Sequence, residues 1–299
     1  MLIAGTGALA CLFAARLSAA GVEVAMLGSW PAGLEALRAH GVRVIDAVKG
    51  EQAYPVQVIR RGEKGPETGE ALVLVKAWQT AQAAHDLKPR LASGGLALSL
   101  QNGLGNDKIL AASLGWERVA VGVTTTGATL IAPGVVRQAG VGPISLARQP
   151  GSERLTDQLI QAGFGVHYEE SVDSLVWGKL AINAAINPLT ALLDIPNGGV
   201  LDIPAARELA HALVREATAV ALALGIEPPY LDPVAALEQV AEQTADNFSS
   251  MLQDLRRGAP TEIDAINGAI VQAGVQAQIP TPVNATLWRL VRARVQKNL

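Results

Sequence analysis

Cysteine is nearly absent from this chain, since only Cys11 occurs among its 299 residues. One thiol cannot form an internal disulfide, and such sparing use of cysteine is typical of proteins from a reducing compartment. We therefore expect a cytoplasmic protein, with Cys11 as a small buried side chain on a helix.

Long apolar runs, positive charge and clustered histidines are lacking too. No stretch has the roughly 20 consecutive apolar residues that a membrane helix needs, so we expect no membrane association. The net charge of −3, with Lys and Arg scattered singly, argues against nucleic acid as a partner. The four histidines are dispersed and match no ligand spacing, so we expect no metal.

Apolar residues are abundant, at 49% against 17% charged residues. Such a composition can fill large hydrophobic cores and excludes a disordered protein. The length is sufficient for two domains, because single cores seldom grow beyond a few hundred residues. We expect a soluble globular protein.

The opening stretch MLIAGTGALA has two incompatible interpretations. It could begin an export signal, but a signal needs positive charge before its apolar core, and the first basic residue is Arg16. The alternative is a buried strand at 1–4, a glycine turn, and a helix at 8–20 that ends at Gly21. We prefer the second interpretation.

Strands and helices alternate through the first part of the chain. The pattern predicts a second strand at 23–27, a helix at 32–40, and further strands at 71–75, 96–100 and 119–123. Apolar strands without a period of two are typical of a parallel sheet covered on both faces. Residues 42–60 and 134–147 indicate shorter hairpin strands, which we expect at an edge of this sheet.

Helical periodicity replaces the strands from about residue 171 onward. The predicted helices cover 171–185, 205–224, 233–255, 262–276 and 284–295. The sequence therefore predicts an α/β fold with a Rossmann-type doubly wound parallel sheet. The dinucleotide-binding domain would span residues 1–169, and a second, all-helical domain would span residues 170–299.

The glycine turn has the Gly-x-Gly-x-x-Ala form of a dinucleotide-binding fingerprint. In this motif the first Gly makes the turn, the second lets the pyrophosphate approach, and the small third residue lets the helix pack on the strand. The helix N-terminus then presents free N–H groups to the phosphates. Glycines at strand ends are also common as simple turn residues. The expected cofactor-binding residues are Gly5, Thr6, Gly7, Ala8, Leu9 and Ala10.

The end of the second strand, at Gly28 and Ser29, bears on the choice of cofactor. NAD enzymes usually carry an acidic residue here and NADP enzymes a basic one. No carboxylate is present to repel a phosphate, which favours NADP (NADPH) and makes NAD less favoured, with Ser29 as a candidate phosphate ligand. Alternatively, Ser29 and Trp30 only turn the chain.

Polar residues follow two predicted strands, at Lys76 and at Asn102. Ligands of open α/β sheets bind beyond the carboxyl ends of the strands, so both side chains could line one crevice. Lys76 could instead extend its amine into solvent, and Asn102 with Gly103 could form a plain turn.

Three polar residues, Lys179, Asn183 and Asn187, interrupt an otherwise apolar helix. Their spacing of four places them along one face. A buried polar row needs partners, which a small polar substrate would supply. Asn187 before Pro188 is also typical of an N-cap with Pro at the first helical position.

Thr261 and Glu262 begin another predicted helix. Thr261 is typical of an N-cap, which would place Glu262 in the first turn, where the helix dipole favours a carboxylate. This alternative explains Glu262 without a catalytic role.

Ordered blocks in both predicted domains resemble the ketopantoate reductase (2-dehydropantoate 2-reductase) family. The blocks are Gly5–Ala10, Val75–Gln79, Gln101–Asn106, Lys179–Thr190, Asp246–Asp254 and Thr261–Gly268. Members reduce ketopantoate to pantoate with NADPH, in the pantothenate branch that leads to coenzyme A. The resemblance implies an NADP-dependent oxidoreductase whose partner is a small 2-oxo acid, and it leaves a homodimer open.

The resemblance also implies roles for single residues. Lys179 matches the general acid, since an ammonium both polarises a carbonyl and donates a proton. Glu262 matches the acidic residue near that lysine. The implied substrate-binding residues are Asn102, Asn183, Asn187, Ser250 and, as a weaker candidate, Asn247. Beyond the glycine turn, the implied cofactor-binding residues are Ser29, Lys76, Asn102 and Glu262.

The chain departs from the family pattern at two positions. Ala10 replaces a common Gly, which the fingerprint tolerates. Ser29 stands where members usually carry an Arg against the 2′-phosphate, so we expect a weakened preference for NADPH and no reversal. The alternatives are an NAD(P)H-dependent reductase of another branched 2-oxo acid and a non-catalytic nucleotide-sensing protein with the same fold.

Overall fold

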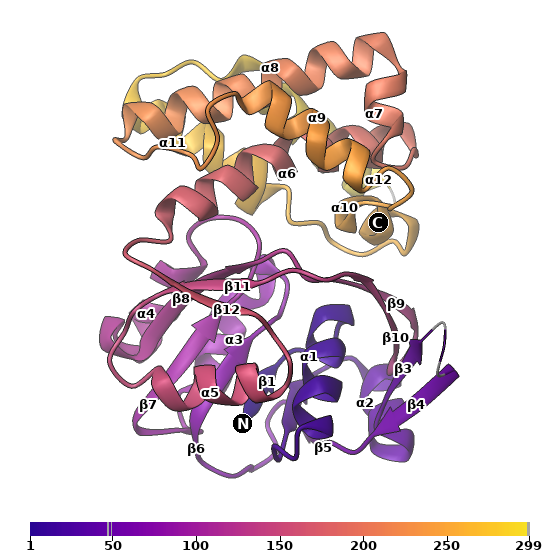
Figure 1. The fold of residues 1–299 in the computed structure, drawn as a ribbon, viewed down its shortest axis with the longest axis vertical. Helices are drawn as coiled ribbons and strands as arrows, with labels where there is room; N and C mark the ends of the chain where they lie inside the picture. Colours follow the sequence, from indigo (N-terminus) through magenta and orange to yellow (C-terminus); the bar gives the residue numbers. More distant parts are fainter. Residues whose placement is uncertain (47, 49, 298–299) are drawn as a thin grey trace. The chain divides into compact units, whose positions relative to one another are not determined.

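The structure, a computed structural model, describes residues 1–46, 48 and 50–297 (Figure 1). The chain forms two compact units. The first comprises Met1–Gln101 and Asn106–Val172, and the second comprises Asn102–Gly105 and the residues from Asp173 onward. Each unit is described by itself below.

The first unit is built on an eight-stranded sheet with the order β12-β11-β8-β7-β6-β1-β2-β5. Neighbouring strands from β5 to β8 pair in parallel, whereas β11 is antiparallel to β8. This arrangement confirms the predicted Rossmann-type sheet. The strands are β1 (Leu2–Ala4), β2 (Ala25–Gly28), β5 (Gln57–Arg60), β6 (Thr68–Val73), β7 (Leu91–Ser99), β8 (Val119–Thr124), β11 (Ile144–Ala147) and β12 (Val166–Glu169).

Helices cover both faces of this sheet. On β1, Ile3 packs into a core with helix α1, while Leu2 and Ala4 belong to a core with helices α3 and α4. Both faces of β1 are therefore buried, which explains its unbroken apolar sequence. The helices of this unit are α1 (Ala8–Ala19), α2 (Pro31–His40), α3 (Thr80–Leu87), α4 (Asn106–Leu114) and α5 (Glu153–Gln161), with single 3-10 turns at Ala77–Gln79 and Trp116–Arg118.

The predicted hairpin strands form, but the expectation that they all extend the main sheet is wrong. Three of them, β3, β4 and β10, make a separate sheet with β9, a strand that we did not predict, in the order β4-β3-β10-β9. Val42 and Val136 from this small sheet pack against α1, so its apolar face is buried on a helix. Only β5 and β11 from the same stretches join the main sheet. The strands of the small sheet are β3 (Val42–Asp46), β4 (Gly50–Tyr54), β9 (Gly127–Ala132) and β10 (Val135–Gly140).

Within its described residues, the second unit is helical, as predicted. Helix α6 is its centre, because α8, α10 and α12 all pack against it. Among the described residues, we find no helix with both the length and the apolar character needed to span a bilayer. The elements are α6 (Asp173–Leu193), α7 (Gly199–Asp202), α8 (Pro204–Ala223), α9 (Pro233–Gln243), α10 (Ser250–Arg256), a π-helix η3 (Asp264–Gly268), α11 (Ala269–Ala277) and α12 (Pro282–Lys297).

Helix α6 continues through Pro188, so the interpretation of Asn187 as an N-cap is wrong. Pro188 has no N–H to donate to the carbonyl of Ala184, four residues earlier. The side chain of Asn267 donates to that carbonyl instead, with its Nδ2 atom 3.0 Å from the oxygen. A polar contact from the π-helix thus supplies the hydrogen bond that proline removes.

A second correction concerns the helix predicted at 233–255, which breaks into α9 and α10. Asp232 caps α9 by accepting from the N–H groups of Val234 and Ala235. Ser249 caps α10 by accepting from the N–H of Leu252 at 3.1 Å. The apolar periodicity continues across the break, which is why it suggested one helix.

We predict that Asn267→Ala lowers the free energy of unfolding by about 1–3 kcal/mol, because it leaves the buried Ala184 carbonyl without a donor. In a Pro188→Ala background, the new N–H of residue 188 can donate to the same carbonyl. The cost of Asn267→Ala should then fall by about 1 kcal/mol. Urea denaturation of the four proteins measures this difference, and equal costs in both backgrounds would contradict the assignment.

Candidate active site

The glycine turn lies at the carboxyl end of β1, where the sheet offers a ligand crevice. The chain runs from β1 through α1 to β2 on one side, while β6 pairs with the opposite side of β1. Open α/β sheets bind ligands at such a reversal of strand order. The turn therefore occupies the expected place for a dinucleotide site.

Gly5 and Gly7 play different parts in this turn. Gly5 has φ +133°, and a Cβ there would lie 3.0 Å from the carbonyl oxygen of Leu74 and 3.3 Å from the Cβ of Ala10. A side chain at Gly5 would therefore be strained and crowded. A Cβ at Gly7 would meet no atom within 4 Å. The space above Gly7 is open, and α1 begins with its N–H groups directly after it.

Ser29 lies exposed between β2 and α2. Immediately before it, Gly28 faces Thr6 of the glycine turn, whose Cγ2 atom would lie 2.6 Å from a Cβ at Gly28. The ring of Trp30 covers Gly33 in the first turn of α2. Trp30 therefore has a packing role, and Ser29 is the residue of this loop that leaves a hydroxyl at the surface.

Lys76 follows β6 by three residues and stands at the start of the 3-10 turn Ala77–Gln79, partly buried. Beside it is a polar network that we did not predict. The side-chain amide of Gln101 donates to the carbonyl of Val75 at 2.9 Å and to the hydroxyl of Thr80 at 2.8 Å. Thr80 in turn donates to the side-chain oxygen of Asn106 at 2.8 Å. This network fixes the loops at the carboxyl ends of β6 and β7.

The other predicted site residues belong to the second unit, and α6 provides three of them. Lys179 and Asn183 are partly buried, and Asn187 is 6% exposed. They lie along one face of a continuous helix whose remaining residues from Leu180 to Thr190 are buried. Burial lowers the pKa of Lys179 from 10.5 to about 8, and the charge of Glu262 opposes this shift.

Glu262 is only 5% exposed, which is costly for a carboxylate without partners. The Asn102 side chain donates to it, with Nδ2 3.4 Å from Oε2. The segment that carries Asn102 packs on the π-helix, where the N–H of Leu104 donates to the carbonyl of Ala265 at 3.0 Å. Gly103 allows this approach, because a Cβ there would lie 2.5 Å from the same carbonyl oxygen. Asn102 and Gly103 are therefore more than a plain turn.

The interpretation of Thr261 as an N-cap is wrong. Its hydroxyl is buried and has no hydrogen-bond partner in the described part of the chain. The π-helix starts only at Asp264, and the carbonyl of Glu262 accepts from the N–H groups of Ala265 and Ile266. Glu262 thus lies directly before the first turn instead of within it.

The two predicted site residues around α10 are less buried than Asn187 and Glu262. Asn247 is exposed, and Ser250 is a partly buried first residue of α10. Ser249, to which we assigned no role, is buried and accepts a hydrogen bond from the hydroxyl of Thr190 on α6 at 2.7 Å. A serine before a helix is an N-cap signal, but the contact with α6 could not be foreseen from the local sequence.

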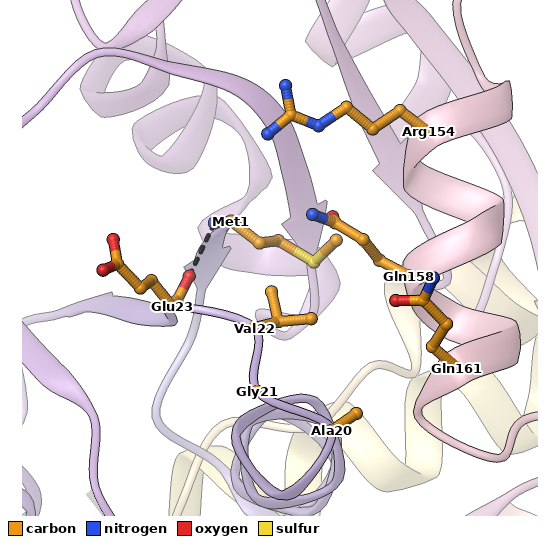
Figure 2. Close-up of a pocket in the computed structure, with 8 residues that line it drawn as sticks. All are labelled: Met1, Ala20, Gly21, Val22, Glu23, Arg154, Gln158 and Gln161. Carbon is orange, nitrogen blue, oxygen red and sulfur yellow. Dashed lines mark hydrogen bonds between the residues drawn. The ribbon is translucent and has the colours of Figure 1, made fainter.

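A separate hollow of about 350 Å³ lies at the opposite, amino-terminal edge of the main sheet (Figure 2). In Figure 2, Arg154 and Gln158 of α5 extend toward Met1 and Val22. This hollow is remote from the glycine turn, so we do not assign it to the dinucleotide. Among the residues that the structure describes, no group of three or more His, Cys, Asp or Glu side chains could hold a metal ion.

Comparison with known proteins shows which family this chain resembles. Two family models match, "Ketopantoate reductase PanE/ApbA" over residues 1–151 and "Ketopantoate reductase PanE/ApbA C terminal" over residues 171–295. The 2-dehydropantoate 2-reductase of Archaeoglobus fulgidus is 38% identical over 97% of this chain and 96% of its own length. That of Pyrococcus abyssi is 32% identical over 98% and 96%.

Solved structures of other proteins have the same fold as this chain. A PanE/ApbA family ketopantoate reductase from Ralstonia eutropha JMP134 superposes with a TM-score of 0.91 at 32% identity, covering 100% of this chain and 99% of that one. D-mandelate dehydrogenase, solved with NADH and anilino(oxo)acetate, superposes with a TM-score of 0.93 at 26% identity and the same coverage. The two family models together span nearly the whole sequence, and this chain therefore belongs to the ketopantoate reductase PanE/ApbA family.

Proposed function

We propose that this protein is a 2-dehydropantoate 2-reductase that reduces ketopantoate to pantoate with NADPH, in pantothenate and coenzyme A biosynthesis. Family membership supports the substrate. The observation that supports the chemistry is the amine of Lys179 in an apolar helix, with Glu262 near enough to affect its pKa.

The first unit is the proposed holder of the cofactor. The turn from Gly5 to Ala10 fits a dinucleotide because the space above Gly7 is open and the N–H groups at the start of α1 are directed to it. When bound, NADPH would supply a hydride to the 2-keto carbon. Lys76, at the carboxyl end of the neighbouring strand β6, is a proposed ligand at the nicotinamide edge.

Lys179 is the proposed general acid. As the 2-keto carbon gains a hydride, its oxygen gains negative charge and must take up a proton to become the hydroxyl of pantoate. An ammonium stabilises this charge and then donates the proton. With a pKa of about 8, Lys179 is mostly protonated at pH 7 yet releases its proton more readily than an exposed lysine.

Glu262 is proposed to keep that amine charged. Its carboxylate raises the pKa of Lys179 against the effect of burial. Asn102 holds the carboxylate by donating to Oε2. For substrate hydroxyl and carboxylate groups we propose Asn183, Asn187 and Ser250, with the exposed Asn247 as the weaker candidate.

A second candidate, NADH-dependent reduction of another 2-oxo acid, is favoured by one position. Ser29 offers a hydroxyl where family members usually carry an arginine, and D-mandelate dehydrogenase, solved with NADH, shares the fold. We still favour NADPH, because no acidic residue at this position would repel a phosphate. A purely nucleotide-sensing role is less favoured, since it would not need an amine in an apolar helix whose pKa responds to the charge of Glu262.

The direct test measures oxidation of NADPH and NADH at 340 nm with ketopantoate and with phenylglyoxylate. We predict the highest kcat/KM for ketopantoate with NADPH. A higher value for phenylglyoxylate would favour the second candidate, and no oxidation with any pair would contradict a reductase.

We predict that Lys179→Met lowers kcat by about 10²–10⁴-fold, because the proton donor is lost. The exposed Lys88 provides a matched control, and Lys88→Met should leave kcat unchanged.

In the unaltered protein, kcat/KM should fall as the pH rises through about 8, since only the ammonium form of Lys179 donates a proton. In Glu262→Gln this fall should begin at lower pH, because a neutral side chain no longer raises the pKa. An unchanged alkaline limb in Glu262→Gln would contradict the assigned pairing.

We predict that Gly7→Ala weakens NADPH binding by at least about tenfold, because the methyl group occupies space meant for the pyrophosphate. Its melting temperature should barely change, since a Cβ at Gly7 meets no protein atom within 4 Å. Gly5→Ala, by contrast, should lower the free energy of unfolding by about 1–3 kcal/mol because of its positive φ. Fluorescence titration and thermal denaturation measure the two effects. Equal NADPH affinity in Gly7→Ala and the unaltered protein would place the cofactor elsewhere.

A further inference from the structure

The edge strand β5 brings a basic residue next to the end of β2. Arg60, the last residue of β5, is in register with Gly28, the last residue of β2. The N–H of Arg61 donates to the carbonyl of Gly28 at 2.9 Å, so this pairing holds to the end of both strands. Ser29 follows Gly28 directly, at the position that usually distinguishes NADP from NAD.

Arg60 belongs to a charged cluster of four arginines and two carboxylates, in which Arg90 donates to the main-chain carbonyls of Asp86 and Glu63. Arg38 pairs with Glu63, with Nη2 2.9 Å from Oε2. Arg61 pairs with Asp86, with Nε 3.0 Å from Oδ2. Among the described residues of this cluster, arginines therefore outnumber carboxylates, and Arg60 contributes to the excess of positive charge.

The main chain of Arg60 is fixed although its side chain is exposed. Its N–H donates to Oε2 of Glu63 at 2.8 Å. This backbone hydrogen bond is the main reason why the pKa of Glu63 is lowered, so the carboxylate stays ionised and keeps both contacts. The residue is therefore anchored at its backbone while the guanidinium can reach a ligand.

The direction of the side chain follows from the strand register. Residues in register on neighbouring parallel strands extend to the same face, so Arg60 lies on the face of Gly28. That face carries Thr6 of the glycine turn, against which Gly28 packs. Two strand spacings, roughly 10 Å, separate Arg60 from β1, which is within the reach of an extended adenosine and an arginine side chain.

We propose that Arg60 binds the 2′-phosphate of NADPH and takes the place of the basic residue that Ser29 does not provide. This proposal rests on the proposed use of NADPH and assigns its selectivity to β5. A guanidinium offers two parallel N–H groups to a phosphate, which the hydroxyl of Ser29 cannot match. Selectivity for NADPH then comes from β5, the strand beside β2. The loop that follows β2 does not contain the residue responsible.

The test compares Arg60→Gln with Arg154→Gln. Arg154 is a matched control, because it is an exposed arginine of the same unit at the amino-terminal edge of the sheet (Figure 2). Isothermal titration calorimetry measures the Kd of adenosine 2′,5′-bisphosphate and of 5′-AMP, which differ only in the 2′-phosphate. We expect Arg60→Gln to weaken the bisphosphate by about 10–100-fold and 5′-AMP by less than about twofold. Arg154→Gln should change neither, and Arg60→Lys should retain part of the affinity.

Kinetics give a second measurement. In Arg60→Gln the KM for NADPH should rise by a similar factor with kcat unchanged, while the KM for NADH stays the same. Equal weakening of both nucleotides, or no weakening of the bisphosphate, would overturn the proposal. The titration contains no keto acid, so it reports on Arg60 even if ketopantoate is not reduced. If the unaltered protein binds both nucleotides equally, Arg60 has no such role, while NADH-dependent reduction could stand.

Discussion

A positive charge placed in an apolar helix is the constraint on which the second unit depends. Lys179 lies on α6, where its neighbours from Leu180 onward are mostly buried, and desolvation alone would make its amine neutral at moderately alkaline pH. The carboxylate of Glu262 opposes this effect, but Glu262 is itself almost fully buried. Neither charge is stable alone at this depth, so the elements that carry them have to be held in position together.

A set of hydrogen bonds from buried asparagine side chains holds these elements together. Asn267 of the π-helix donates to the Ala184 carbonyl of α6 and also to the side-chain oxygen of Asn284. Asn284 in turn donates a hydrogen bond to Glu216 on α8, with Nδ2 2.9 Å from Oε2. The π-helix that follows Glu262 is thus tied to the helix that carries Lys179. Such π-turns often mark functional positions, since their wider spacing moves one residue out of the regular helical register.

Local sequence signals predicted much of the first unit. Gly5, Gly7 and Ala10 lie at the carboxyl end of a buried strand, as their spacing indicated, and the apolar strands form the parallel sheet. The family and the reductase function were also accessible, because the motif residues are spread in order over the chain. The roles of single residues in the site remain predictions that the proposed variants can test.

The errors share a physical cause, which is contact between residues distant in sequence. Nothing near Pro188 reveals that the Ala184 carbonyl will accept a hydrogen bond from Asn267, which lies 83 residues after Ala184 in the chain. The strands β3 and β10 pair with each other and pack on α1, a choice that polarity alone could not distinguish from the edge of the main sheet. Thr261 carries the composition of an N-cap, yet the carbonyl of Glu262 takes the first backbone hydrogen bonds.

The short segment Asn102–Gly105 determines how this polypeptide can be cut into fragments. It is inserted between β7 and α4 of the first unit, but it packs with the second. The polypeptide therefore changes unit at three points, after Gln101, after Gly105 and after Val172. A fragment that starts at Asp173 would lack the amide that binds its own buried carboxylate, so the helical part is not a self-sufficient module.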